Sequence, residues 1–319
     1  MNPHRSLLGH HMEDFQNLKE SLGFSRNTHS FYLQEIDDCL ALHYPKLDSL
    51  TEEFTLEWIQ KRPTECKNTQ KRRMVTLREF GKYLNTIGVP SYTLPSYYIG
   101  KYTRSTPYLF SDEELTRLFS TFDHIAPYWK TPERKYIIPV LFRMMYCCGL
   151  RPAEPLALLR GDVDVDSGIL FIRNSKGHKD RIVRMSQDLV ELCSRFDKKM
   201  GERTWFFSFQ GSNRPCQSLW VRKILVACWG KSGLDHGQKK PVPYSFRHNF
   251  ATRIILNWLK DGLPFEVMMP FLCEYMGHSE FASTLYYINL LPENIVRNSE
   301  IDWDRLNTIY PEVNDEADR

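Results

Sequence analysis

Residues 133–184 read ERKYIIPVLFRMMYCCGLRPAEPLALLRGDVDVDSGILFIRNSKGHKDRIVR and contain the change of pattern that decides the fold class. From Glu133 to Cys148 the pattern is that of a largely apolar helix. Gly149 follows, where the left-handed residue that ends a helix belongs, and Pro152 suits the first turn of another helix. The first part of the run therefore predicts a helix, a sharp stop and a new helical turn.

The second part of the run has the pattern of a β-hairpin. Ile169 to Ile172 and Ile182 to Met185 are short β runs, and the polar segment Asn174 to Asp180 lies between them. Helical patterns that give way to one small hairpin predict a mainly α fold with a small antiparallel β-sheet, an α+β domain.

Helical patterns also fill the part of the chain that precedes this run. Ser25 and Thr28 can cap one helix. Thr51 to Arg62 is a second candidate, which Pro63 would stop, and Asn68 to Leu84 is a third. The first 90 residues therefore predict a helical N-terminal domain.

The rest of the chain is divided by turn and helix signals. Residues 88–107 are rich in Pro, Ser, Gly and Tyr, as is typical of a linker, and Ser111 to Glu114 is a capping box that opens a helix. Pro243 to Trp258 and Pro264 to Asn289 have helical patterns, and Pro270 is expected to kink or break the second.

We therefore expect a helical domain over residues 1–90, a linker over 91–107, a second domain over 108–298 and an acidic tail over 299–319. The 319 residues are enough for two domains, and 42% hydrophobic and 25% charged residues are ordinary for a soluble globular chain.

The composition also bears on location. The longest apolar stretch, Ile137 to Leu150, is interrupted by Arg143 and is too short to span a bilayer, and the N-terminal residues lack the apolar core of a secretory signal. The eight cysteines form no CxxC pair, which favours free thiols in a reducing compartment over a disulfide framework or a zinc site. These features predict a cytoplasmic protein without a membrane partner.

Charge is distributed unevenly along the chain. Lys61 to Arg104 contains ten basic and two acidic residues, whereas Ser299 to Arg319 contains seven acidic and two basic ones. A basic block of that density indicates a nucleic-acid partner, although a solvated helix face has the same composition. The candidate DNA-contacting residues are the bases of the third predicted helix, namely Lys71, Arg72, Arg73, Arg78 and Lys82.

Four short motifs contain residues suited to chemistry. Gly149 to Glu154 (GLRPAE) places an arginine three residues before a carboxylate, and Ser175 to Arg181 (SKGHKDR) is a basic hairpin turn. Tyr244 to His248 (YSFRH) brings a tyrosine and an arginine onto one helix face, and a Gly-His pair at 277–278 precedes Tyr287 by nine residues. Each motif alone is a weak signal. An arginine beside a glutamate is usually a surface pair, a Gly-His pair is usually a helix end, and a tyrosine in a Tyr-Tyr pair is usually part of a core.

Together and in this order, the motifs resemble the catalytic domain of the tyrosine recombinase, or phage-integrase, superfamily. The residues that carry the resemblance are Arg151, Lys176, Arg247, His278 and Tyr287. The resemblance implies a catalytic domain preceded by a helical core-binding domain that contacts DNA. It also implies that Glu154 orients the arginines or a neighbouring base, and that His248 supports the site more than it reacts.

The resemblance assigns a chemical role to each residue type. Two guanidinium groups, Arg151 and Arg247, can bind the oxygens of a DNA phosphodiester and offset the charge that grows in the transition state. Tyr287 would attack phosphorus to form a 3′-phosphotyrosine, Lys176 would protonate the leaving 5′-oxygen and His278 would bind the phosphate. This chemistry needs no metal and no cofactor.

Two positions leave alternatives open. Tyr244 stands where the family usually has histidine, and a phenol exchanges protons poorly near neutral pH but can donate a hydrogen bond to phosphate. Tyr286 competes with Tyr287 for the role of nucleophile, and the nine-residue offset from His278 favours Tyr287.

The function that the resemblance implies is site-specific recombination of double-stranded DNA, in the integration, excision or resolution of a mobile element. It further implies a monomer that assembles into a homo-tetramer on paired DNA sites, and Asp302 to Tyr310 could form a helix that docks on a neighbouring protomer or on its own domain. The alternatives are a type IB topoisomerase, a catalytically inactive DNA-binding member of the family, and a helical protein whose bases only keep it soluble.

Overall fold

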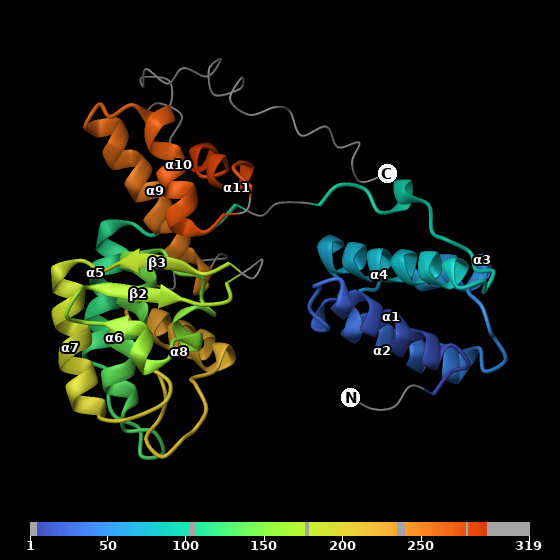
Figure 1. Cartoon of the computed structure of the whole chain (residues 1–319), viewed down its shortest axis with the longest axis horizontal. Coiled ribbons are helices and arrows are strands. Elements are labelled where there is room, and N and C mark those ends of the chain that lie inside the picture. The colour runs from blue at the N-terminus through green and yellow to red at the C-terminus, as the bar shows by residue number, and fades with distance from the viewer. Residues whose placement is uncertain (1–4, 103–105, 176–178, 235–239, 279, 292–319) are drawn as a thin grey trace. The chain divides into compact units, whose positions relative to one another are not determined.

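The computed structural model describes residues 5–102, 106–175, 179–234, 240–278 and 280–291, which fold into two compact units (Figure 1). The division falls between Ser105 and Thr106. Lys176 and the acidic segment 299–319, including Asp302 to Tyr310, lie outside the described residues.

The N-terminal unit consists of four helices around one apolar core. They are α1 (Gly9–Ser21), α2 (Asn27–His43), α3 (Glu52–Trp58) and α4 (Lys67–Thr86). Their inward-facing side chains form a single buried cluster that includes Phe15, Ile36, Phe54 and Phe80. The helical N-terminal part read from the sequence is confirmed, and α1 is a helix that no specific signal had indicated.

Two details of this unit differ from expectation. Thr51 caps α3 by accepting a hydrogen bond from the backbone N–H of Phe54, but the helix ends at Trp58 and not at Arg62. The expected linker begins on the N-terminal unit, because Leu94 is buried in its core and the N–H of Tyr92 donates to the carbonyl of Leu50 over 2.6 Å. A 3₁₀ turn, η1 (Ser96–Tyr98), follows.

In the C-terminal unit, four helices lie beside a three-stranded antiparallel sheet (Figure 1). The helices are α5 (Asp112–Asp123), α6 (Arg134–Cys148), α7 (Gln187–Met200) and α8 (Ser218–Lys231), and α5 opens with the predicted capping box. The expected mainly α fold with a small antiparallel sheet is confirmed.

The sheet has the order β1 (Val163–Asp164), β2 (Ile169–Ile172) and β3 (Arg181–Arg184). In its register Leu170 lies opposite Val183, and both are fully buried, whereas Phe171 and its partner Ile182 are exposed. Side chains alternate between the two faces of a strand, so Arg181 lies on the same inward face as Val183.

A second helical group contains α9 (Tyr244–Lys260), α10 (Phe265–Met276), α11 (Ala282–Leu285) and the 3₁₀ turn η4 (Ile288–Leu290). They share a small core of their own that includes Ile255, Met269 and Tyr287. Of the expected kink or break at Pro270, the break does not occur, because α10 continues through it. Pro270 lies on the exposed side of the helix, where a carbonyl that loses its N–H partner can be hydrated.

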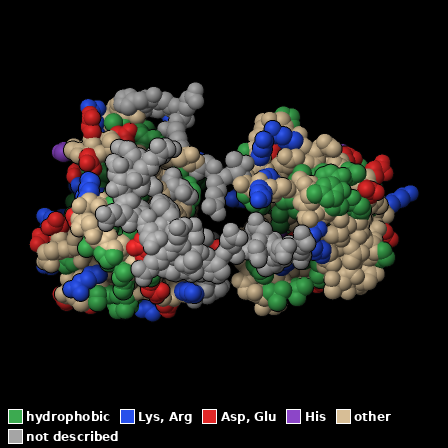
Figure 2. Space-filling view, turned by 90° about the horizontal axis from the view of Figure 1, so that it is seen from above, with side chains coloured by type: hydrophobic (Ala, Val, Ile, Leu, Met, Phe, Trp, Pro, Cys, Tyr) green, Lys and Arg blue, Asp and Glu red, His purple; other side chains and the backbone are tan. Residues whose placement is uncertain are grey.

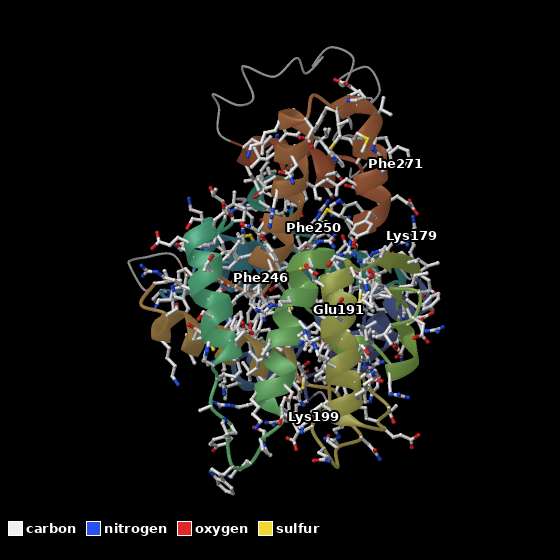
Figure 3. The ribbon with its side chains drawn as sticks, turned by 90° about the vertical axis from the view of Figure 1, so that its left-hand side faces the viewer. Lys179, Glu191, Lys199, Phe246, Phe250 and Phe271 are labelled. Carbon is white, nitrogen blue, oxygen red and sulfur yellow. The ribbon has the colours of Figure 1, made fainter. Side chains whose placement is uncertain are left out.

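The chain after α6 also makes tighter turns than expected. Pro152 begins no α-helix, and the chain instead forms the short 3₁₀ turns η2 (Pro155–Ala157) and η3 (Arg160–Asp162). Gly149 is left-handed, with φ of 59°, as predicted. A Cβ at this position would overlap the ring of Phe250, which lies along α9 above Phe246 (Figure 3).

Replacing Gly149 by Ala should lower the free energy of unfolding by about 2–4 kcal/mol, because strain from positive φ adds to overlap with Phe250. The matched control is Gly233→Ala, where φ is also positive (70°) but nothing lies within 4 Å of the new Cβ, and which should cost only about 1 kcal/mol. Chemical denaturation followed by tryptophan fluorescence measures both, and equal losses would contradict the steric argument.

Candidate active site

The C-terminal end of α10 holds three arginines through three consecutive carbonyl oxygens. Tyr275 accepts from Nε of Arg181 over 3.0 Å, Met276 from Nη2 of Arg247 over 2.7 Å, and Gly277 from Nη2 of Arg151 over 2.6 Å. The last carbonyls of a helix lack partners within the helix and carry partial negative charge, so they attract cations.

The helix can end this way because of its glycine. Gly277 is left-handed, with φ of 63°, and the N–H of His278 returns to the carbonyl of Cys273 over 3.0 Å. The turn leaves the carbonyls of Met276 and Gly277 directed at the arginines and places the His278 ring beside them. The Gly-His pair noted in the sequence therefore ends α10 and also places the His278 ring beside Arg247.

Glu154 binds two of these arginines at once. Its Oε1 accepts from Nη1 of Arg151 (2.9 Å), from Nη1 of Arg181 (2.7 Å) and from Oγ of Ser175 (2.7 Å). Its Oε2 accepts from the backbone N–H of Arg151 (2.7 Å) and from Nη2 of Arg181 (2.8 Å). Burial alone would raise the pKa of Glu154, but the hydrogen bonds and charge of Arg181, with those from Ser175 and Arg151, lower it to about 2.

Arg247 is fully buried and has no carboxylate partner among the described residues. It donates to the carbonyls of Gly149 (2.6 Å) and Met276 (2.7 Å) and to the His278 ring, while its Nε hydrogen makes no hydrogen bond with any described residue. Burial and the neighbouring charge of Arg151 lower the pKa of Arg247. An anion entering here would relieve an uncompensated buried charge.

The hydrogen bonds of His278 indicate its tautomer. Nη2 of Arg247 can only donate, so Nε2 of His278, 2.9 Å away, accepts. Nδ1 then carries the proton and donates to Oγ1 of Thr284 over 2.7 Å. The ring stacks on Tyr287, with centroids 6.1 Å apart and planes 18° from parallel.

Tyr287 is only 2% exposed and lies between two histidine rings, since the centroid of His248 is 5.6 Å from its own. Burial raises its pKa to about 12, and the positive charge of Arg247 only partly offsets that rise. The neighbouring Tyr286 is partly exposed, and its ring centroid lies 6.3 Å from that of His248. The stacking of Tyr287 on His278 and the charge of Arg247 on its hydroxyl favour Tyr287 for chemistry at this site.

Tyr244 and His248 lie one helical turn apart on α9, with ring centroids 4.9 Å apart. Burial, reinforced by the charge of Arg247, lowers the pKa of His248 to about 4, so its ring is neutral at pH 7. Its Nδ1 is buried without a hydrogen-bond partner among the described residues. Tyr244 is 37% exposed, so its hydroxyl can reach a ligand from solvent.

Of the site residues predicted from the sequence, the structure brings together Arg151, Glu154, Tyr244, Arg247, His248, His278 and Tyr287. Lys176 lies outside the described residues, next to Ser175, which contacts Glu154.

The five bases of α4 divide into two kinds. Arg73 is 1% exposed and donates to the Glu65 carboxylate and to the carbonyls of Trp58 and Gln60. The prediction that it contacts DNA is therefore wrong, because its guanidinium is used inside the unit. Lys71, Arg72, Arg78 and Lys82 are partly or fully exposed.

The sequence reading missed three residues that support the cluster, Ser175, Arg181 and Thr284. A signal for Arg181 was present, because strand alternation places it on the face of the apolar Val183, where an arginine needs a buried partner. Ser175 and Thr284 had no such signal, since their roles depend on residues far away in the sequence.

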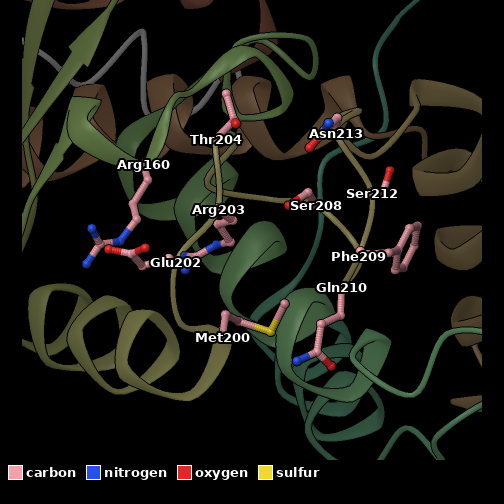
Figure 4. A pocket seen from close by; sticks show the side chains of 11 residues that line it. Arg160, Met200, Glu202, Arg203, Thr204, Ser208, Phe209, Gln210, Ser212 and Asn213 are labelled. Atoms are coloured by element: carbon pink, nitrogen blue, oxygen red, sulfur yellow. The ribbon is translucent and has the colours of Figure 1, made fainter.

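No other feature of the described residues forms a comparable candidate site. Among the described residues no group of His, Cys, Asp and Glu is arranged to hold a metal, and no described helix is long and apolar enough to cross a bilayer. A cavity of about 510 Å³ after α7 is lined by Arg160 and Arg203 (Figure 4), but both pair with Asp197, which removes their attraction for an anion.

The arrangement can therefore bind a phosphodiester between two guanidinium groups beside a histidine and a tyrosine. Comparisons with known proteins bear on the same residues. Residues 110–294, more than half of the chain, match the model of the phage integrase family.

Curated relatives match along most of the chain. The chain is 25% identical to the putative integrase/recombinase y4rE of Sinorhizobium fredii over 295 residues, which covers 88% of this chain and 91% of the relative. It is 27% identical to y4rB of the same organism over 315 residues, covering 92% and 97%. It is 28% identical to tyrosine recombinase XerA of Thermococcus kodakarensis over 203 residues, covering 63% and 64%.

Two solved structures share the fold. The XerH site-specific recombinase bound to a palindromic difH substrate gives a TM-score of 0.64 at 18% identity, covering 85% of this chain and 78% of that one. The Tn1549 transposon integrase in complex with transposon right end DNA gives 0.64 at 14% identity, covering 89% and 96%.

The Glu154 carboxylate gives a pH-dependent test of the cluster. Replacing Glu154 by Gln should lower the free energy of unfolding by about 3 kcal/mol at pH 7, because a carboxyl whose folded pKa is about 2, against an ordinary 4.5, stabilises the fold when ionised. The folded pKa is the lower one, so this stabilisation is present above pH 4.5 and is lost as the pH falls through 2. Chemical denaturation across this range should show the two proteins converging.

The control is Glu191→Gln, an exposed carboxylate on α7 (Figure 3), which should change stability little at any pH. A constant difference between Glu154→Gln and the unmodified chain from pH 7 to pH 3 would contradict the proposed charge network.

Proposed function

The chain belongs to the phage integrase family, and on that premise we propose that it is a site-specific DNA recombinase that cleaves and rejoins strands through a 3′-phosphotyrosine. The observation that carries the proposal is the convergence of Arg151, Arg247, His278 and Tyr287, from four separate segments, on one buried site.

The two arginines supply the electrostatic part of the reaction. Arg151 and Arg247 donate hydrogen bonds to backbone carbonyls, and these bonds fix the planes of both guanidinium groups before DNA arrives. A scissile phosphate binding here would accept from their remaining N–H groups, and Tyr244 could donate from the exposed side. Pre-organised donors of this kind stabilise the extra negative charge of the pentavalent transition state.

Tyr287 is the proposed nucleophile. Its hydroxyl oxygen forms the bond to phosphorus, the bond from phosphorus to the 5′-oxygen breaks, and the phenolic proton must leave as the 5′-oxygen gains one. In the closed site the pKa of Tyr287 is about 12 even with the charge of Arg247 beside it, so the phenol stays protonated there at neutral pH. We propose Lys176 as the acid for the 5′-oxygen, and the reverse steps rejoin the strand.

The burial of Tyr287 has a further consequence for the reaction. A phosphate on duplex DNA cannot reach a side chain that is 2% exposed, so the segment containing α11 and η4 must shift outward before cleavage. Arg247 is 0% exposed, so the same shift must uncover it. We propose that binding of DNA at the arginines drives this shift, since it gives the buried charge of Arg247 an anionic partner for its remaining N–H groups.

The N-terminal unit is proposed to bind double-stranded DNA through the exposed bases of α4. Arg72 borders a hollow of about 530 Å³, together with the exposed rings of Phe31 and Tyr102, and Lys71 lies 5.6 Å from the Tyr102 ring. Figure 2 shows Lys and Arg side chains beside exposed apolar ones on one face of this unit. Bases next to exposed aromatic rings are typical of nucleic-acid surfaces.

The finer parts of the proposal follow the relatives. XerH and the Tn1549 integrase are named as DNA complexes, and this supports DNA as the partner here. A homo-tetramer on paired sites, a monomer without DNA, a role in a mobile element and a cytoplasmic location belong to the same proposal. The assignment of residues 1–90 to DNA binding and of residues 108–298 to catalysis is also part of this proposal.

One observation favours a second candidate, a DNA-binding member of the family with weak or no catalysis. Tyr244 stands where a histidine would exchange protons near neutral pH. Specific binding of DNA without covalent adducts would favour it, and relaxation of plasmids without a specific site would instead favour a type IB topoisomerase.

A nicked suicide duplex tests the nucleophile. The unmodified chain and Tyr286→Phe should form covalent protein–DNA adducts at similar rates, whereas Tyr287→Phe should form none, because the Tyr287 ring stacks on His278 and its hydroxyl is exposed to the charge of Arg247. Denaturing gels with labelled DNA detect the adduct. Adducts in Tyr287→Phe, or their loss in Tyr286→Phe, would reverse the assignment.

The α4 surface can be tested by the salt dependence of DNA binding. Arg72→Ala should reduce the slope of log K against log salt by about one, because each phosphate contact contributes about that much. Lys46→Ala, an exposed base of the same unit outside α4, should leave the slope unchanged. Fluorescence anisotropy measures both, and equal slopes for the two variants would argue against this surface.

A further inference from the structure

We propose that Arg181 is a positioning residue of the site, which holds Glu154 so that Arg151 stays oriented toward the scissile phosphate with its positive charge available. This inference rests on the proposed function and deepens it.

The geometry of the Glu154 carboxylate is the first reason. Arg181 binds it with two parallel hydrogen bonds, one to each oxygen, of 2.7 and 2.8 Å. The Arg151 side chain reaches the same carboxylate through Nη1 alone, over 2.9 Å. Bidentate pairing fixes a carboxylate in its plane, so Arg181 decides where Glu154 lies and Glu154 in turn decides where Arg151 lies.

The charge balance is the second reason. The side chains of Arg181 and Glu154 are 7% and 6% exposed, and that of Arg151 is 14% exposed, so solvent screens them little. Two guanidiniums and one carboxylate leave a net charge of +1. Without Arg181, Glu154 and Arg151 would form a neutral pair, and a phosphate would have to compete with the carboxylate for Arg151.

Arg181 also contacts the other support of Arg151. Its Nε donates to the carbonyl of Tyr275, and its Cδ would lie 3.1 Å from a Cβ built on Gly277, whose carbonyl accepts from Arg151. Arg181 thus binds one of the two groups that orient Arg151, the Glu154 carboxylate, and lies close to the other, Gly277. Gly277 accordingly leaves room for Arg181 as well as turning the chain.

The same side chain closes the base of the hairpin. Nη1 of Arg181 lies 3.2 Å from Oγ of Ser175, and Ser175 itself donates to Glu154. Arg181 therefore ties β3 to the segment that follows β2 and to the turn that carries Glu154. All three nitrogens of its guanidinium donate within this network, which is why it positions other residues and does not itself bind the phosphate.

The test measures adduct formation on the nicked duplex under single-turnover conditions, with DNA affinity measured separately. Arg181→Met should slow adduct formation by about 100-fold, the cost of misplacing a reacting group by about 1 Å, with affinity changed by less than about threefold. Arg181→Lys, which keeps the charge but loses the bidentate contact, should recover about tenfold of that loss. Arg184→Met, an exposed arginine on the same strand, is the matched control and should behave as the unmodified chain.

Two readouts separate positioning from a merely structural role. In Arg181→Met the acid side of the pH–rate profile should move up by about one unit, because the Glu154 carboxyl loses its strongest cationic partner. The double variant Arg181→Met/Glu154→Gln should be no slower than the slower single variant, since both act through one network. It also removes both buried charges together, so it remains informative if Arg181→Met does not fold.

The outcomes are distinguishable. Arg181→Met behaving as Arg184→Met would overturn the inference, as would a slowed variant with an unmoved pH profile and no recovery in Arg181→Lys. Multiplicative effects in the double variant would also overturn it. Failure of the unmodified chain to form any adduct would instead refute the proposed function.

Discussion

Three carbonyl oxygens at the end of one helix determine how the rest of the site is built. Arg181, Arg247 and Arg151 each donate to one of the last carbonyls of α10 and the residue after it. Guanidinium groups repel one another, and the negative end of a helix is one of the few neutral structures that can gather several of them. The site thus depends on where α10 ends, and this is set by the left-handed Gly277.

The same carbonyls explain why the cluster remains cationic. Among the residues that the structure describes, Glu154 is the carboxylate that pairs with these arginines, and it is shared between Arg151 and Arg181. Arg247 has no carboxylate partner among the described residues and is fully buried. Burying a charge without a counter-ion lowers stability. Under the proposed function a DNA phosphodiester would supply the missing anion, so an arrangement that costs stability in the free protein would become favourable when DNA is bound.

Tyr287, like Arg247, lies in an environment that suits the free protein and the proposed reaction differently. It packs in the small core of α9, α10 and α11, where it contributes to stability but is closed to solvent, and its raised pKa opposes ionisation. Under the proposed function, stability of the free protein and readiness for chemistry require different positions of this side chain. Since α11 and η4 are short elements, moving them would disturb less of the fold than a shift in the larger core of α5 to α8 would.

The sequence alone determined the local structure and the types of residue in the site. The capping box at Ser111, the left-handed Gly149 and the hairpin follow from neighbours a few residues apart, and the five signature residues are recognised by their order along the chain. Only the tertiary structure decided that Arg73 is a buried structural residue and that Arg181 supports the site. Arg73 looks like a surface charge in the sequence, and strand alternation indicates for Arg181 only that it needs a buried partner. The roles of both depend on carboxylates that sequence patterns do not locate, Glu65 in one case and Glu154, 27 residues away, in the other. A charge is solvated or buried according to which partner the fold brings to it, and that partner is a property of packing.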